Sequence, residues 1–115
     1  MERNKPTEYD AVLRAQQAIA GKWSFLVLYY LSKRPYRFNE LQRVLPSMTQ
    51  ATLSKLLKTL EARGLISRKK YPQIPPKVEY SVGPVGELFL PLLKDLTKAG
   101  QKAIKLFPVL EETEE

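Results

Sequence analysis

The sequence predicts a mainly α fold with a small β-ribbon, an α+β arrangement in which a helix-turn-helix is followed by a two-stranded wing. Residues 49–63 repeat leucine at helical spacing and are followed by Gly64, the residue that most easily takes the left-handed conformation ending a helix. Residues 65–82 then alternate in two runs around a proline-rich turn, as a returning pair of strands does. We therefore expect one winged helix-turn-helix domain over residues 1–115, with its helix-turn-helix at 38–63.

Three helices are predicted in the N-terminal half of the chain. The first should span 7–20, because Gly21 interrupts its apolar pattern. The second, 22–33, carries aromatic and aliphatic residues around most of its surface, so we expect it at the centre of the core. The third, 38–45, has one apolar face and should end at Pro46.

A long helix is predicted over 84–107, with proline at its first position, where the missing N–H costs least. Pro91 lies inside its apolar pattern and should bend or split it. Because this stripe is longer than so small a domain can cover, we expect it to form a dimer seam with the helix at 7–20, across a two-fold axis. The alternative is that the stripe belongs to the core of a single chain.

The charge of the chain is concentrated in one region. The 115 residues include 43% hydrophobic residues, enough for a modest core, and carry a formal charge of +7. Such a charge favours a polyanionic partner, either nucleic acid or an anionic membrane surface. Between residues 55 and 77, seven lysines and arginines accompany one acid, Glu61, so the basic excess lies on the helix at 49–63 and on the wing. Residues 108–115 form an acidic tail, which is more often solvated than engaged in competition with DNA.

The chain contains no cysteine and no histidine. This composition excludes disulfides and thiol chemistry and removes the usual catalytic base, so we expect no metal site, no cofactor and no enzymatic activity. The longest apolar run, residues 25–31, is too short to cross a bilayer, and no apolar run of signal-peptide type opens the chain. We therefore expect a cytoplasmic protein without a membrane partner.

Several segments together resemble the HxlR-type winged helix-turn-helix transcriptional regulators of bacteria and archaea, over about residues 19–100. The wing segment is the most specific, because generic winged helices share the leucines and the glycine but rarely this wing. The segments are Gly21-Lys22-Trp23, Arg37-Phe38-Asn39-Glu40-Leu41, the run 53–61, Gly64-Leu65-Ile66 and Pro75-Pro76-Lys77-Val78-Glu79-Tyr80-Ser81.

The resemblance implies a homodimeric repressor or activator that binds double-stranded DNA. In such regulators the first and last helices form the dimer contact, and two recognition helices meet successive major grooves. Many relatives also carry a cysteine near the position of residues 10–12, and some use it to sense electrophiles or oxidants. This chain has no cysteine and cannot use that signal.

The start of the recognition helix, 49–63, is expected to approach base edges. Gln50 is suited to adenine and Lys55 to guanine, while the small Ala51 and Thr52 are suited to a thymine methyl group. Other polar residues of the turn, the helix and the wing (65–82) are expected at phosphates, and those of the wing at phosphates or in a minor groove. The full set of predicted DNA contacts is Ser47, Thr49, Gln50, Ala51, Thr52, Ser54, Lys55, Lys58, Arg68, Lys69, Lys70 and Lys77.

Each of these features has a plainer interpretation. The polar side of the recognition helix can be a solvated face, and wing lysines can protect an edge strand from aggregation. A winged helix can also serve as a protein-interaction module in a larger complex. Aromatic residues such as Trp23, Tyr29, Tyr30 and Phe38 are more often core than the lining of a ligand pocket, so the sequence assigns no small-molecule effector.

Overall fold

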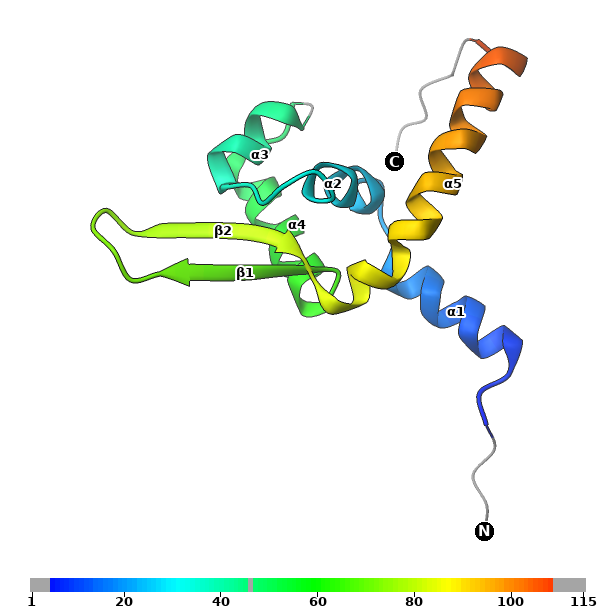
Figure 1. The fold of residues 1–115 in the computed structure, drawn as a ribbon, viewed down its shortest axis with the longest axis horizontal. Coiled ribbons are helices and arrows are strands. Elements are labelled where there is room, and N and C mark those ends of the chain that lie inside the picture. The colour runs from blue at the N-terminus through cyan, green and yellow to red at the C-terminus, as the bar shows by residue number, and fades with distance from the viewer. Residues whose placement is uncertain (1–4, 46, 109–115) are drawn as a thin grey trace.

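The computed structural model describes residues 5–45 and 47–108, which form five helices and one two-stranded antiparallel sheet (Figure 1). The predicted α+β winged helix-turn-helix is confirmed, with element ends that differ from the predicted ones by one or two residues. In order, the elements are α1 Glu8–Ala18, α2 Ser24–Leu31, α3 Phe38–Val44, α4 Gln50–Ala62, β1 Ile66–Tyr71, β2 Lys77–Val82 and α5 Pro84–Leu106.

Two sequence predictions fall on residues outside the described part. Pro46 is one of them, although α3 does end at Val44 and the next residue, Leu45, is extended. The acidic tail is the other, because only Pro108 of the range 108–115 is described. Within the described residues, no helix is both long and apolar enough to cross a bilayer.

Helix α1 begins at a reciprocal cap and ends before the predicted Ala20. The Thr7 hydroxyl accepts the backbone N–H of Asp10 at 3.2 Å, and the Asp10 carboxylate accepts the backbone N–H of Thr7 at 2.8 Å. At the other end, the carbonyl of Ala20 accepts hydrogen bonds from Ser24 Oγ at 2.7 Å and from Arg63 Nη1 at 2.7 Å. Ala20 therefore belongs to a turn that ties the start of α2 to the end of α4.

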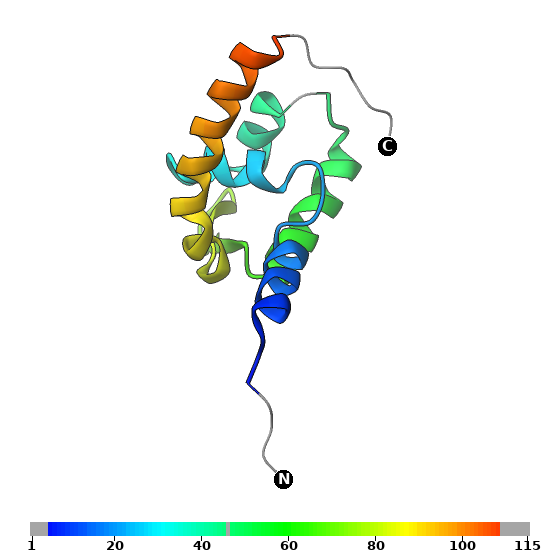
Figure 2. The same cartoon turned by 90° about the vertical axis from the view of Figure 1, so that its right-hand side faces the viewer.

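The core is built around α2, as the sequence predicts. Val27 and Leu28 are fully buried there, and Leu31 is nearly so. In Figure 1, α2 lies between α5 on one side and α3 and α4 on the other, and Figure 2 shows α4 and α5 on opposite sides of the molecule. The helix-turn-helix closes over it with Leu41 from α3 and the leucines of α4, all but one of which are fully buried: Leu53, Leu57 and Leu60. Leu56, the fourth leucine of α4, is only partly buried.

The turn at Gly64 connects α4, the ribbon and α5. Gly64 has a φ of +75°, and its N–H donates to Glu61 while the N–H of Leu65 donates to Leu60, which together make a Schellman motif. The Gly64 carbonyl then accepts the N–H of Val85 at 2.9 Å in the first turn of α5. The predicted left-handed helix end is confirmed, and it also caps the next helix.

The ribbon pairs β1 with β2 over their full lengths, from Ile66 opposite Val82 to Tyr71 opposite Lys77. Tyr80 of β2 also exchanges two backbone hydrogen bonds with Tyr36, of 2.8 and 2.9 Å, in the segment that leads into α3. The root of the wing is therefore fixed to the body of the domain, while the turn between its strands projects away from it (Figure 1).

Helix α5 is continuous through Pro91. Of the two predicted effects of this proline, a split or a bend, the split is therefore wrong. Figure 1 shows its first turns running at an angle to the rest of the helix. Its apolar stripe divides into two sides, because Phe89 and Leu93 pack into the core whereas Leu88 and Leu92 are exposed. One side of the stripe is thus covered by this chain and the other is not.

Candidate nucleic-acid interface

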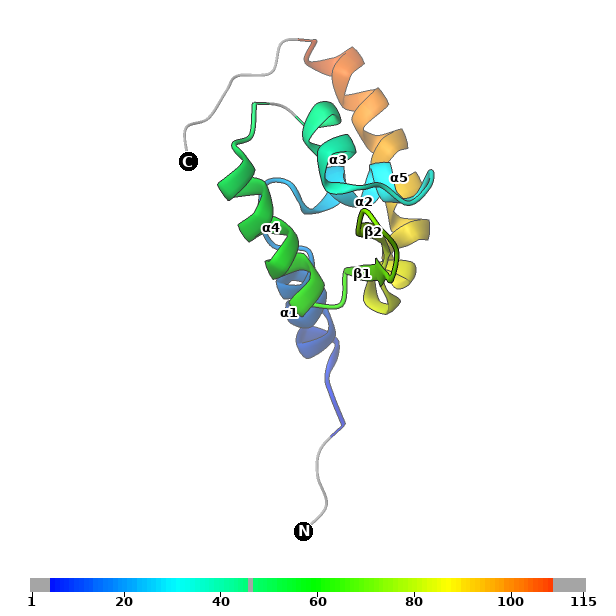
Figure 3. The same ribbon diagram turned by 90° about the vertical axis from the view of Figure 1, so that its left-hand side faces the viewer.

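Helix α4 has a buried side and a polar side. Its leucines face the core, and Ala51, Lys55 and Lys58 are exposed, as the helical spacing predicts. Viewed toward the tip of the wing, α4 lies along one side of the molecule and α5 along the other (Figure 3). The exposed start of this polar side, with Ala51 and Lys55, can therefore approach a large ligand.

The start of α4 is held by a threonine cap. Thr49 Oγ accepts the backbone N–H of Thr52 at 3.1 Å and donates its own proton to Thr52 Oγ at 2.8 Å. The two hydroxyl groups thus share one hydrogen bond, and Thr49 serves as the cap of the helix in addition to being a predicted DNA contact. Gln50, at the first position of the helix, is exposed.

The turn before α4 is fastened to α3. Gln42 Nε2 donates to the carbonyl of Met48 at 3.3 Å, and the Met48 side chain is buried. Ser47 is exposed and has a φ of +29°, an uncommon conformation for a residue with a side chain. The predicted contact residue Ser47 is thus presented at the surface of the turn, next to the start of α4.

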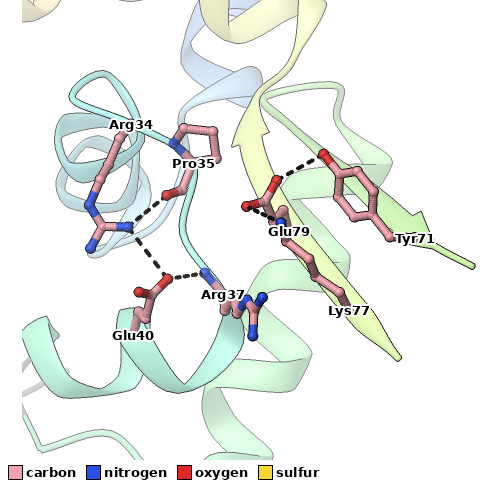
Figure 4. A network of polar contacts seen from close by, with 7 residues as sticks. All are labelled: Arg34, Pro35, Arg37, Glu40, Tyr71, Lys77 and Glu79. Carbon is pink, nitrogen blue, oxygen red and sulfur yellow. Dashed lines mark hydrogen bonds and ion pairs between the residues drawn. The ribbon is translucent and has the colours of Figure 1, made fainter. Parts of the chain in front are cut away.

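One face of the ribbon is occupied by contacts within the chain. Tyr71 donates a 2.9 Å hydrogen bond to Glu79, and Lys77 lies 3.5 Å from the other oxygen of the same carboxylate. The ammonium groups of Lys69 and Lys77 also lie 4.8 and 4.6 Å from the centre of the Tyr71 ring. Figure 4 shows Lys77 folded back along its own ribbon. Lys77 is therefore the predicted wing contact with the least freedom to meet DNA.

A second set of polar contacts lies at the start of α3. Glu40 accepts the backbone N–H of Arg37 at 2.8 Å and lies 3.4 Å from Arg34 (Figure 4). The hydrogen bond from the Arg37 backbone, helped by the charge of Arg34, holds the pKa of Glu40 below its ordinary value. The Tyr71 hydroxyl similarly lowers the pKa of Glu79, with smaller contributions from Lys77 and Arg37. Both carboxylates are thereby kept ionised where the wing meets α3.

The other face of the ribbon meets α4. Arg68 and Tyr80 stand directly opposite each other in the strand register, so their side chains leave the same face. Together with residues of α4 they line a polar cavity of about 290 Å³. The sequence predicts Ser54, Lys58 and Arg68 as separate contacts, and the structure brings them together with Tyr80 and Glu61. The last two were missed, although the helical spacing of Glu61 from Lys58 could have placed it on the same side of α4.

A larger cavity, of about 640 Å³, lies between α2 and α5. Tyr29 and Leu93 contribute apolar walls, and Lys33, which follows α2, and Lys94 and Lys98 of α5 lie around it. Of the aromatic residues that the sequence left open between core and pocket, Trp23, Tyr30 and Phe38 pack against the core, whereas Tyr29 is partly exposed and lines this cavity.

These features define the class of protein. A helix with one buried side and one polar side follows a short turn and precedes a basic ribbon. That arrangement is a winged helix-turn-helix of the DNA-binding type.

Comparison with known proteins identifies the family. The chain matches the HxlR-like helix-turn-helix family over residues 18–107 and belongs to it. It is 49% identical over 85 residues to the HTH-type transcriptional regulator YkvN of Bacillus subtilis, which covers 74% of this chain and 72% of YkvN. It is 48% identical over 85 residues to an HTH-type transcriptional regulator of Halalkalibacterium halodurans, covering 73% of this chain and 75% of the relative.

Solved structures agree with the fold. The redox regulator HypR in its reduced form superposes with a TM-score of 0.78 at 35% identity, covering 85% of this chain and 97% of HypR. The family and these relatives make the chain a DNA-binding transcription regulator of the HxlR type. The 115 residues contain no cysteine, so a thiol-based signal does not follow from the likeness to HypR.

Proposed function

We propose that the protein acts as a homodimer on a near-palindromic operator, with α4 as the recognition helix and the ribbon as a wing on the flanking backbone. The observation that carries this proposal is the polar side of α4, which presents Gln50, Ala51 and Lys55 to solvent while the leucines of the same helix hold it in the core. Residues at the start of such a helix reach base edges in the major groove. Gln50 and Lys55 are the contacts that would distinguish sequences.

The dimer is supported by apolar surface that one chain leaves uncovered. Tyr9 and Val12 of α1 are 73% and 60% exposed, and Leu88 and Leu106 of α5 are 76% and 75% exposed. The radius of gyration is 16.7 Å, whereas a compact chain of this length has one of about 13 Å. Helices α1 and α5 both lie at the end of the molecule opposite the wing tip (Figure 1). A second copy that covers both helices would direct its own α4 toward the same DNA.

The test is the salt dependence of binding to duplex DNA. A dimer that neutralises about six to ten phosphates should lose affinity with salt at a slope of about −5 to −9 in log–log form. Operator half-sites should lie about 34–36 Å apart, one turn of the duplex. Fluorescence anisotropy across a salt series, followed by footprinting of retained promoter fragments, measures both. A flat salt response would contradict DNA binding by this surface and favour a protein-interaction module.

The division of labour between helix and wing is tested by two alanine variants. Lys55→Ala should reduce the preference for operator over random DNA, by about 1–3 kcal/mol for a lost base contact. Lys69→Ala should weaken binding to operator and to random DNA to a similar extent, because a phosphate contact carries no sequence information. Competition binding with operator and random duplex gives the ratio of the two affinities for each variant. Equal loss of discrimination in both variants would reject this assignment.

A further inference from the structure

The polar cavity of about 290 Å³ between α4 and the ribbon gathers side chains from three elements. Ser54, Lys58 and Glu61 follow one another at intervals of four and three residues, so they share one face of α4. Arg68 of β1 and Tyr80 of β2 face them from directly opposite positions of the ribbon. We call this space the α4–wing cavity. It combines two cations, two hydroxyl groups and one carboxylate.

The two cations of this cavity are not neutralised within the described chain. The described chain contains the ion pairs Arg34–Glu40 and Lys77–Glu79, and both lie outside the cavity. Lys58 and Arg68 therefore have no carboxylate within 4.0 Å among the described residues. Glu61 lines the same cavity and also stays beyond that distance from both. The cavity therefore keeps a net positive charge, with hydrogen-bond donors from Ser54 and Tyr80 beside it.

This chemistry suits a phosphate group. A guanidinium donates two parallel hydrogen bonds to a phosphate, an ammonium adds a point charge, and hydroxyl groups donate to the remaining oxygens. A pocket for a drug-sized effector usually has about 300–1,000 Å³ and mostly apolar walls. The α4–wing cavity is smaller and polar, which favours a small oxyanion over an apolar ligand.

We propose that the α4–wing cavity holds one phosphodiester of the DNA backbone, bound jointly by Lys58, Arg68 and the hydroxyl of Tyr80. This inference rests on the proposed DNA-binding function and assigns to it a shared phosphate site. The position supports a backbone phosphate, because the cavity lies between α4 and the ribbon, which are the two elements proposed to contact the duplex. Because the site uses both elements, it fixes the angle between helix and wing on the DNA.

Glu61 limits how tightly this site can bind a phosphate. Its carboxylate lines the cavity and repels a bound phosphate. Glu61→Gln keeps the size of the side chain and removes the charge, so this variant should bind duplex DNA of any sequence several-fold more tightly. Weaker or unchanged binding by Glu61→Gln would contradict a phosphate in the cavity.

The decisive experiment measures coupling between Arg68 and Tyr80. Affinity for a mixed-sequence duplex is determined by anisotropy over a salt series for the wild type, Arg68→Gln, Tyr80→Phe and the double variant. Arg68→Gln should lower the salt slope by about 0.9 per protomer, because one phosphate contact is lost. Tyr80→Phe should weaken binding about tenfold without changing the slope, since it removes a hydrogen bond and no charge.

In the Arg68→Gln background, Tyr80→Phe should cost less than about twofold, because the phosphate is no longer held there. Lys69 provides the matched control, since it lies on the other face of the ribbon. In a Lys69→Gln background, Tyr80→Phe should keep its full effect. Equal effects of Tyr80→Phe in both backgrounds, or an unchanged slope in Arg68→Gln, would overturn the shared site. Thermal unfolding of Tyr80→Phe checks that its ring still packs in the core.

Two further outcomes separate this proposal from its alternatives. If wild-type protein shows no salt-dependent binding to duplex, the proposed function itself fails; if it binds normally and the variants match it, only the phosphate site fails. Titration with inorganic phosphate at constant ionic strength, followed by NMR shifts of the Arg68 and Tyr80 amides, tests a free ligand. No saturation is expected, and saturation below millimolar phosphate that Arg68→Gln abolishes would assign the cavity to a free phosphate compound instead.

Discussion

Residues 24–82 and the two flanking helices, α1 and α5, differ in where their apolar side chains lie. In residues 24–82 the large apolar side chains are mostly buried, with Tyr29 and Ile74 as the exposed ones. In α1 and in the outer side of α5 the reverse holds, and Val12, Leu92 and Leu96 remain between 45% and 60% exposed. Residues 24–82 therefore bury most of their own apolar side chains, together with Ala18 of α1 and Phe89 of α5, whereas the outer sides of the flanking helices stay exposed in the single chain.

The difference indicates separate roles for the middle region, residues 24–82, and for the flanking helices α1 and α5. A rigid middle region is needed to hold the polar side of α4 and the root of the wing in a constant arrangement. In the dimer that we propose, the flanking helices would set the distance between two such regions, which a palindromic operator requires. Changes in the middle region should therefore act on folding, and changes on the outer face of α5 should act on assembly.

The largest expected effect is on folding, and it comes from truncating a buried side chain in the middle region, residues 24–82. Leu57 is 1% exposed at the centre of α4, so Leu57→Ala should cost about 2–5 kcal/mol of unfolding free energy. Urea unfolding followed by circular dichroism measures this loss. Leu56→Ala is a suitable comparison on the same helix, because Leu56 is only partly buried. Similar losses in both variants would show that α4 is not held as the structure describes.

A smaller effect is expected where the middle region meets α5. A Cβ atom at Gly86 would collide with the backbone oxygen of Leu65, so Gly86→Ala should displace α5 and destabilise the fold by about 1–3 kcal/mol. Gly100 is the matched control on the same helix, since a Cβ there meets nothing within 4 Å. Gly100→Ala should stabilise the helix by about 0.5–1 kcal/mol. Thermal unfolding of the two variants should therefore shift in opposite directions, and a shift in the same direction would contradict this packing.

On the outer face of α5, a charge should affect assembly far more than folding. Leu92→Asp should leave the folded chain within about 0.5 kcal/mol of the wild type and dissociate the dimer, because it places a carboxylate in the apolar contact. Sedimentation velocity gives the oligomeric state, and circular dichroism verifies folding. Gln101→Asp adds the same charge on the opposite side of the helix and should remain dimeric. A wild type that is monomeric at high concentration would reject the dimer altogether.

The smallest expected effect depends on pH and concerns the wing. The hydrogen bond from Tyr71 lowers the pKa of Glu79, so it stabilises the fold above the ordinary pKa of 4.5 and this contribution disappears as pH falls through the lowered value. Tyr71→Phe should therefore be less stable than the wild type at neutral pH, and the difference should vanish in acid. Urea unfolding over an acid pH series measures it. A difference that persists at the lowest pH would assign it to packing instead.

Much of the exposed surface of α4 could be predicted from the sequence. The leucine spacing of α4 determines its buried side and hence its exposed side, and Gly64 follows the helix because only glycine takes that conformation at little cost. These are local properties, set by neighbours within one or two helical turns. The basic excess likewise follows from the sequence alone, because its lysines and arginines cluster in the segments that form α4 and the wing.

The tertiary structure decided which of those residues are engaged with each other. Lys77 was predicted as a DNA contact, yet Glu79 and Tyr71 hold it on the ribbon. Tyr80 was only part of a family-like segment, and strand pairing placed it opposite Arg68, where both line the same cavity as Lys58.

The sequence by itself thus determined the class of fold, the buried face of α4 and the sign of the charge, because these follow from the spacing and composition of neighbouring residues. Only the tertiary structure divided the stripe of α5 into a covered and an uncovered side, with Leu93 on one and Leu92 on the other. It also gathered the α4–wing cavity from three elements. The physical reason is that burial of a whole stripe and convergence of side chains both depend on the packing of segments distant in the chain.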